Sequence, residues 1–281
     1  MSCSLTERGS YRTVSTEWAK FWLRDGVEHL HAHYVTHAFT PHTHEGYVIA
    51  TIEGGAQAFR YRGRVHRATP GHVTFINPGE VHTGNAATEQ GWRYRPLYPS
   101  VERLRRGAEE IFSAAAEPYF ADAVVYDPDL AARVRRYHLV SELGGDLARE
   151  EAFLELITCA VARYANGPFR PRRVAHEPAA VKRVRDYLEA HVCANATLAE
   201  LAHLTGLSPY AVMRAFRQQT GLTPHGYQVQ RRVEAAKRRL RAGESIAAVA
   251  TETGFFDQSH LGKHFKRIVG VTPHTFLRGT S

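Results

Sequence analysis

The sequence has few cysteines and no long hydrophobic run. Its three cysteines, Cys3, Cys159 and Cys193, are scattered along the 281 residues and form neither a pairing framework nor a CxxC metal motif. No stretch approaches the roughly 18 uninterrupted apolar residues of a membrane span, and the opening segment MSCSLTERGSYRTV lacks the apolar region of a signal peptide. These absences argue against a disulfide scaffold and a membrane protein, and they predict a cytoplasmic protein.

Composition and charge divide the chain into two parts. Hydrophobic residues make up 43% of the sequence and charged residues 23%, which is typical of a globular protein and argues against disorder. At roughly 150 residues per domain, this length predicts two domains. From Arg170 to the end there are 18 Lys and Arg against 8 Asp and Glu, whereas the first 169 residues hold 18 against 20. A basic domain attracts nucleic acid, although a solvated helical surface would have the same composition.

The segment 166–178 separates the two parts, because its prolines and polar residues cannot hold a regular element. We therefore expect domains at 1–165 and 179–281, with 166–178 as the linker. Short alternating apolar runs between glycine-containing turns over 27–99 predict a small β-sandwich or barrel. Helical periodicity over 101–165 predicts two or three trailing helices, whose apolar stripes should pack against the barrel or a second subunit.

The basic part repeats itself. Ala202-x3-Gly206 recurs 48 residues later as Ala250-x3-Gly254, and each copy is followed by an amphipathic segment that ends in Gly-x-Thr-Pro. Each copy predicts a short helix, a glycine turn and a second helix, since a small alanine permits close crossing and glycine permits positive φ. The segment 227–240 predicts one continuous helix between the copies, roughly 20 Å or more in length. We expect two helix-turn-helix motifs that enter successive major grooves of DNA.

The second helix of each copy has an apolar face for the core and a polar face for DNA. Val212, Phe216, Leu261 and Phe265 have the spacing of core residues. On the other face, Arg suits guanine, Gln suits adenine, and Met or Tyr can contact a thymine methyl group. The candidate DNA-binding residues are Tyr210, Met213, Arg214, Arg217, Gln258, Ser259, Lys263 and Arg267. A solvated surface residue is the alternative for each of them.

Residues 180–278 resemble the DNA-binding domain of the AraC/XylS family of transcription regulators. The second copy, from Ala247 to Pro273, matches nearly every position of the family's pattern. The resemblance implies that the two recognition helices place six residues near the bases: Tyr210, Met213, Arg214, Gln258, Ser259 and Lys263. It also implies a homodimer on direct repeats near promoters, with activation through contact with RNA polymerase.

The first part resembles the cupin-like effector domain of this family, through Pro41-His42-Thr-His44 and the run from Pro70 to His82. Metal-binding cupins use such an HxH pair, a glutamate four or five residues on, and a later histidine. Val48 and Ile49 stand where that glutamate belongs. Three imidazoles could still hold a divalent ion, but the family's domain usually binds organic effectors, and we expect no metal cofactor.

The mouth of a barrel supplies a concave, mainly apolar cavity for such an effector. The candidate effector-binding residues are His42, His44, Glu53, His82, Trp92 and Tyr94. Trp92 lies two residues from Tyr94, on the same strand face, as a stacking platform. Glu53 and Tyr94 match ligand-contact positions of an arabinose-binding member of the family, whereas Pro96 replaces a tryptophan there, which argues against arabinose. Ordinary barrel residues with satisfied hydrogen bonds are the alternative.

Together these patterns predict an α+β protein of two domains that has no catalytic activity. We expect an effector-controlled activator that binds promoter DNA. A cupin-type metalloenzyme using His42, His44 and His82 is the alternative from another class. An architectural DNA-binding protein, whose barrel only dimerises, is a third.

Overall fold

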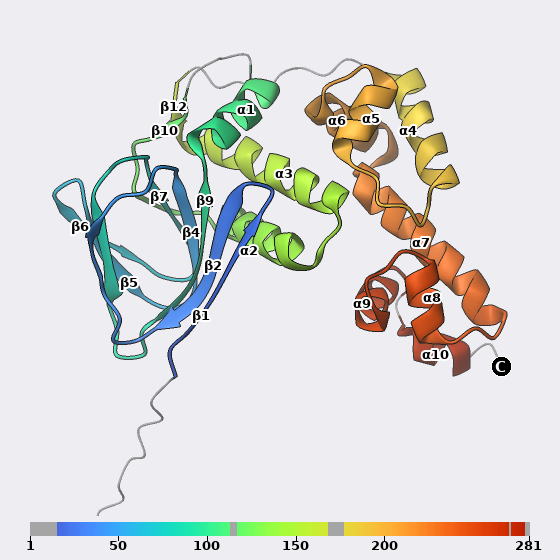
Figure 1. Ribbon diagram of the computed structural model, residues 1–281, viewed down its shortest axis with the longest axis horizontal. Helices are drawn as coiled ribbons and strands as arrows, with labels where there is room; N and C mark the ends of the chain where they lie inside the picture. The colour runs from blue at the N-terminus through green and yellow to red at the C-terminus, as the bar shows by residue number, and fades with distance from the viewer. Residues whose placement is uncertain (1–15, 113–116, 168–176, 270, 279–281) are drawn as a thin grey trace, which may run out of the picture. The chain divides into compact units, whose positions relative to one another are not determined.

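The computed structural model describes residues 16–112, 117–167, 177–269 and 271–278 (Figure 1). The chain divides into a barrel unit, residues 1–98 and 123–131, and a helical unit, residues 99–122 and 132–281. In the described part, no helix is both long and apolar enough to cross a membrane. The opening segment with Cys3 and the linker residues 168–176 lie outside the described residues, while Cys159 and Cys193 are free thiols.

Two sheets form the barrel unit, with strand orders β1-β2-β9-β4-β7-β11 and β3-β8-β5-β6. The strands are β1 (Trp18–Arg24), β2 (Val27–Tyr34), β3 (Phe39–His42), β4 (Val48–Gly55), β5 (Gln57–Tyr61), β6 (Arg64–Ala68), β7 (His72–Ile76), β8 (His82–Ala86), β9 (Trp92–Pro99) and β11 (Val124–Tyr126). The predicted barrel over 27–99 is confirmed. Strand β1 lies before that range and was not predicted, because its sequence WAKFWLR lacks the two-residue alternation of a half-buried strand.

Tight turns and alternation fix which residues enter the barrel core. Arg62 and Gly63 join β5 to β6 with Tyr61 opposite Arg64, and both turn residues have positive φ, 49° and 72°. This geometry suits a two-residue hairpin and sets the register. The buried core cluster consists of Ala32, Val48, Ala50, Ile52, Phe59, Tyr61, Ala68, Ile76, Trp92, Tyr94 and Ala123.

The helical unit contains the trailing helices and the basic part of the chain. Its elements are α1 (Val101–Ile111), β10 (Tyr119–Phe120), α3 (Asp146–Tyr164), β12 (Ala165–Asn166), α4 (Pro178–Ala190), α5 (Leu198–Thr205), α6 (Pro209–Thr220), α7 (Pro224–Arg241), α8 (Ile246–Glu252), α9 (Gln258–Val269) and α10 (Pro273–Arg278). Helix α2 (Pro128–Leu143) begins in the barrel unit and continues in the helical unit. The compact units thus group α1 and α3 with the basic helices, and the predicted domain boundary at 166–178 stays a prediction.

The two helix-turn-helix motifs have the predicted elements. In the first motif, α5 and α6 are joined through Gly206, and in the second, α8 and α9 are joined through Gly254. Both glycines have positive φ, 73° and 79°. Helix α7 joins the motifs and, at 1.5 Å per residue over 18 residues, is about 27 Å long.

A buried arginine of α7 fastens both motifs to this helix. The Arg232 guanidinium donates to the carbonyl oxygens of Val192 and Ala194, which precede the first motif, at 2.8 and 2.9 Å. It also donates to the Gly254 carbonyl in the turn of the second motif, at 2.8 Å. One rigid planar group thus donates to carbonyls of two separate segments. It fixes the position of the turn of the second motif relative to the segment that precedes the first motif.

We expect Gly254→Ala to destabilise the chain more than Gly206→Ala. Alanine costs about 1–2 kcal/mol at either positive φ. A Cβ at position 254 would also lie 2.9 Å from the Arg232 guanidinium carbon and from the Cys193 carbonyl oxygen, whereas nothing lies within 4 Å at position 206. This crowding should cost roughly another 1–3 kcal/mol. Urea unfolding of both variants measures the difference, and equal losses would contradict the close approach at Gly254.

Candidate effector pocket and DNA-binding surface

A pocket lies between the two sheets of the barrel unit. Both sheets contribute side chains, and the pocket with its open mouth encloses about 500 Å³. The lining residues are Phe39, His42, His44, Val48, Ala50, Gln57, Phe59, Thr74, Ile76, His82, Thr83, Tyr94 and Tyr98. This mixture of apolar walls and a few polar groups is typical of a small-molecule site.

Three histidines meet at this pocket. His42 ends β3, His44 follows it, and His82 begins β8, with ring centroids 4.3 to 5.2 Å apart. The Nδ1 atom of His42 lies 2.7 Å from the Thr40 carbonyl oxygen, and that of His82 lies 3.2 Å from the Glu80 carbonyl oxygen. Since only a protonated ring nitrogen can donate to a carbonyl, Nδ1 carries a hydrogen in both rings, and Nε2 is the acceptor in the neutral form of each.

Burial favours the neutral form of His44 and His82. Burial, together with the neighbouring His82 and His42, lowers the pKa of His44 to about 4. Burial also lowers the pKa of His82. Among the described residues, His42, His44 and His82 are the one group of three or more side chains that could hold a metal ion, with ligand atoms within 4.8 Å of one another. Three neutral imidazoles without a carboxylate would make an open nitrogen-donor site.

Two tyrosines of β9, Tyr94 and Tyr98, also line the pocket. The hydroxyls of Tyr94 and Tyr98 are hydrogen-bonded to each other, and burial is the main cause that raises the pKa of both. Tyr98 also packs against His44, with ring centroids 4.8 Å apart. Tyr98 and Gln57 line the pocket but were not among the predicted effector-binding residues. The two-residue period of β9 could have identified Tyr98, because it lies four residues beyond Tyr94 on the same face.

The structure places Trp92 and Glu53 away from the pocket lining. Trp92 is completely buried in the barrel core and packs against Tyr34, with ring centroids 5.4 Å apart. Glu53 lies at a bulge of β4, where its carboxylate accepts from Arg95 at 2.7 Å and contacts His31 at 2.9 Å. Burial acts to raise the pKa of Glu53, but Arg95 and His31 hold it below its usual value. Glu53 is thus already paired within the sheet.

Stability should fall as the pH drops from 6.5 towards 4, in part because of His44. Its folded-state pKa of about 4 is below the ordinary 6.5, so the unfolded chain binds this proton more readily than the folded chain. His44→Gln should reduce the proton uptake on unfolding in this window by up to one proton. Urea unfolding at several pH values gives the free energy of unfolding, and its slope against pH measures this proton uptake. The exposed His37→Gln serves as the matched control, and identical slopes for both variants would contradict the buried neutral state of His44.

The polar face of the second recognition helix is exposed. All four residues predicted to contact DNA from this helix are exposed: Gln258, Ser259, Lys263 and Arg267. Leu261 and Phe265, on the other face, are completely buried. Helix α9 therefore has the two faces that the sequence predicts.

The first recognition helix is different. Arg214 and Arg217 are exposed, but Tyr210 and Met213 are only 1% and 6% exposed. The Arg214 guanidinium donates to the Tyr210 hydroxyl at 3.1 Å, and the Arg217 guanidinium contacts Glu155 of α3 at 3.3 Å. The side chains of Tyr210 and Met213 are packed inside the helical unit and are not accessible to DNA in this structure.

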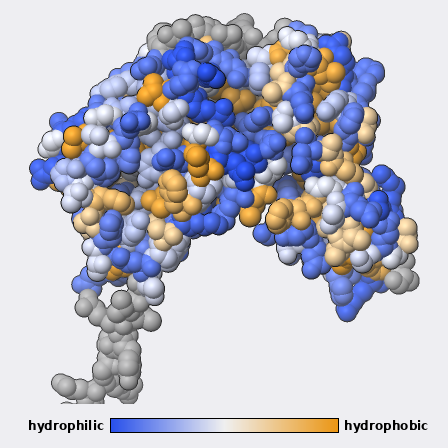
Figure 2. All heavy atoms as spheres, viewed as in Figure 1, coloured by the Kyte–Doolittle hydropathy of each residue, from blue (hydrophilic) through white to orange (hydrophobic). Residues whose placement is uncertain are grey.

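The charge distribution supports a polyanion-binding surface. On the face seen in Figure 2, hydrophilic residues cover most of the surface and the apolar residues form separate patches. Within α7, three arginines occur in the last turn, Arg238, Arg239 and Arg241. Arg238 and Arg241 are exposed, whereas Arg239 is paired with Glu244 and Glu252. Exposed cations favour contacts with phosphates without selecting a base.

Comparison with known proteins agrees with these two sites. The AraC-like ligand binding domain matches residues 26–157, and a helix-turn-helix domain matches residues 201–279. An uncharacterized HTH-type transcriptional regulator of Bacillus subtilis (strain 168) is 32% identical over 224 residues, which cover 79% of this chain and 81% of that protein. The arabinose operon regulatory protein of Escherichia coli (strain K12) is 26% identical over 244 residues, 84% of this chain and 81% of that protein.

Among solved structures, a probable AraC family transcriptional regulator from Rhodopseudomonas palustris is 27% identical, covers 36% of this chain and 97% of that chain, and has a TM-score of 0.35. The ligand-binding barrel and the paired helix-turn-helix motifs define a transcription regulator. The chain belongs to the AraC family of such regulators.

Proposed function

We propose that this regulator is an activator that binds promoter DNA as a homodimer in the cytoplasm, contacts RNA polymerase and responds to a small molecule in the barrel pocket. The main observation in support is the exposed polar face of α9 on a motif that α7 and Arg232 hold rigidly. Dimerisation is supported by Leu139 and Leu143, which lie one turn apart on α2 and are 41% and 55% exposed. Apolar side chains at this spacing are suited to a helix of a second subunit.

The proposed roles of the exposed residues follow from their chemistry. Gln258 begins α9, where a carboxamide could pair with the N6 and N7 atoms of adenine. Arg214 could pair with guanine once its bond to Tyr210 is released. Lys263 and Arg267 suit phosphates, since a flexible cation binds them without strict geometry.

Gln258→Ala and Arg214→Ala should each weaken binding to the operator by about 1–3 kcal/mol and relax base choice at one position. Binding to a random duplex should change little. Fluorescence anisotropy with a duplex that the full chain selects from genomic fragments measures both affinities at physiological salt. Gln230→Ala, an exposed glutamine of α7, is the control. Equal losses on both duplexes would instead assign these residues to phosphate contacts.

The pocket favours an uncharged effector that forms hydrogen bonds. The side chains that line it in the described part of the chain include no Lys, Arg, Asp or Glu. The burial that lowers the pKa of His44 and raises the pKa of Tyr98 keeps both groups neutral at physiological pH. A charged ligand would therefore lose its hydration without a counter-charge, which is costly. A small neutral molecule with hydroxyl or amide groups fits these walls best.

Neutral hydroxylated compounds should raise the melting temperature of the full chain more than carboxylates or amines of similar size. Tyr94→Phe and Gln57→Leu should each weaken the best ligand roughly 3-fold to 10-fold, because each removes one hydrogen bond. A thermal-shift screen followed by calorimetry measures this. Stabilisation by charged compounds alone would contradict the neutral character of the pocket.

A metal-dependent enzyme is the second candidate, and the cluster of His42, His44 and His82 favours it. Elemental analysis of the purified chain separates the two candidates. Stoichiometric iron, manganese or zinc that His82→Ala abolishes would support the enzyme, whereas DNA binding that does not depend on metal would support the regulator.

A further inference from the structure

Two glutamates from outside the first helix-turn-helix motif accept hydrogen bonds from the first turns of its helices. Glu110 of α1 accepts from the backbone N–H of Tyr210 at the start of α6. Glu150 of α3 accepts from the backbone N–H of Leu198 at the start of α5, at 2.6 Å. All four residues belong to the helical unit. Both helices of the first motif thus have a carboxylate at their amino end.

Helix α3 provides two further glutamate contacts, one with a backbone N–H and one with an arginine side chain. Glu151 accepts from the backbone N–H of His225 at the start of α7, at 2.8 Å. Glu155 contacts the Arg217 guanidinium of α6 at 3.3 Å, and it also pairs with Arg136 of α2. Glu151 is completely buried, and this burial raises its pKa to about 7. Placing a carboxyl group here is costly, so the contact is a specific feature of the fold.

These contacts are additional to the helices' own caps. Thr197, Ser208 and Thr223 each accept from the N–H three residues further along, at the start of α5, α6 and α7. Glu110, Glu150 and Glu151 accept hydrogen bonds from other N–H groups of the same first turns, which the local caps do not satisfy. In the second motif, Ser245 and Asp257 cap α8 and α9 from within the motif.

The first turns of such helices are also where DNA phosphates bind. Backbone N–H groups at helix amino ends and arginine side chains are common phosphate donors in protein–DNA complexes. The glutamates present acceptor oxygens to these same donors. Phosphate and glutamate therefore compete for one set of groups, while the polar face of α9 stays exposed.

We propose that these four glutamates mask the first motif and the start of α7, and that binding of the complete operator requires α1 and α3 to release them. We name them the carboxylate clamp: Glu110, Glu150, Glu151 and Glu155. This inference rests on the proposed DNA-binding function.

The chain itself connects the clamp to the pocket. Strand β9 contains Tyr94 and Tyr98 of the pocket wall and ends at Pro99. Ser100 then caps α1, the helix that carries Glu110. A ligand that shifts β9 would move the start of α1 directly, which provides a route from effector to clamp without an intermediate element.

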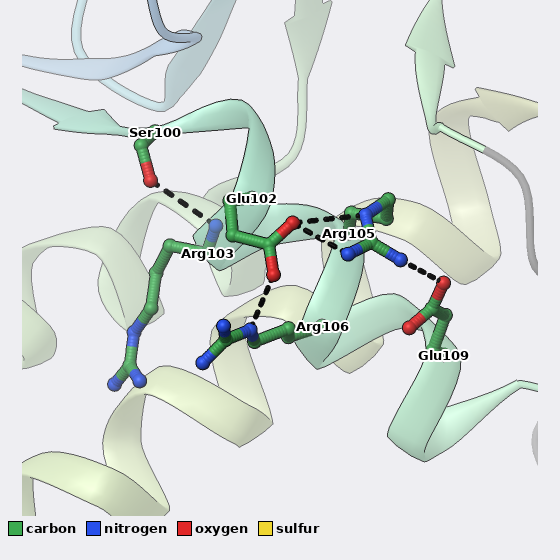
Figure 3. A network of polar contacts seen from close by, with 6 residues as sticks. All are labelled: Ser100, Glu102, Arg103, Arg105, Arg106 and Glu109. Carbon is green, nitrogen blue, oxygen red and sulfur yellow. Dashed lines mark hydrogen bonds and ion pairs between the residues drawn. The ribbon is translucent and has the colours of Figure 1, made fainter.

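Helix α1 offers a matched control. Figure 3 shows Glu102 between Arg105 and Arg106, and Glu109 paired with Arg105, on the part of α1 that begins at the Ser100 cap. These carboxylates pair within their own helix. Their removal changes the net charge as much as removal of two clamp residues but leaves the first motif covered.

The test compares Glu110→Ala/Glu150→Ala with Glu102→Ala/Glu109→Ala in the full chain, without effector. Anisotropy with the selected operator duplex should give a Kd roughly tenfold lower for the clamp variant than for the unmodified chain. The control variant should differ from the unmodified chain by less than about threefold. Melting temperatures establish that both variants are folded.

A folded clamp variant that binds the operator no more tightly than the control would overturn the proposal. If the clamp variant fails to fold, hydrogen exchange in the unmodified chain decides: saturating operator should increase exchange in α3, and unchanged exchange in α3 would overturn the proposal. If neither the unmodified chain nor the clamp variant prefers any duplex, the DNA-binding function itself fails. That result is distinct from failure of the clamp alone, in which the unmodified chain binds specifically.

Discussion

The arrangement of the two DNA-binding motifs depends on one buried cation, Arg232 of α7. Arg232 is 7% exposed, and its guanidinium donates to three backbone carbonyls, two that precede the first motif and one in the turn of the second. Without this guanidinium, the carbonyls of Val192 and Gly254 would lose its N–H donors, whereas Ala194 would keep Gln228 at 3.0 Å. Lost hydrogen bonds of this kind are costly. The close approach of Arg232 also explains why a glycine is needed at position 254. One side chain thus holds the two motifs against the helix that separates them.

Because the two motifs are held rigidly, masking one of them lowers the DNA affinity of both together. If the two motifs moved independently, covering α6 would leave α9 free to bind DNA alone with little change. When α7 holds both, the complete site requires both faces at once, and loss of one removes much of the affinity. The contacts of Glu110 and Glu151 therefore act on the whole DNA-binding surface.

Local patterns were sufficient to predict the elements but not every contact. The helix-turn-helix motifs follow from alanine and glycine spacing within about 20 residues, and the structure has them at the expected places. The histidines that line the pocket were identified through the resemblance to cupin motifs, and His42 and His82 lie at strand ends while His44 follows β3. Glu53 was assigned to the pocket through resemblance, but a bulge in β4 and the pairing with Arg95 on β9 determine its position. A bulge has no clear signal in one sequence.

The contact between Glu110 and the Tyr210 backbone N–H could not have been predicted, for a related reason. Its partner Glu110 is 100 residues away in the sequence, and a glutamate at the end of an amphipathic helix has nothing to distinguish it from a solvated one. Trp92 has the correct strand face but packs into the core, since a large aromatic side chain fills the space between Tyr34 and Tyr94. Periodicity identifies the face of a strand but not the depth at which a side chain ends.

The spacing between the two halves of the operator tests whether α7 and Arg232 hold the two motifs rigidly. A rigid connection through α7 and Arg232 requires the two sub-sites to lie on one face of the duplex, where major grooves repeat about every 34 Å. Inserting 5 base pairs between the sub-sites rotates one of them by about half a turn. We expect the affinity of the full chain to fall to that for random DNA. Unchanged affinity for the altered duplex would show that the motifs bind independently and would contradict this account.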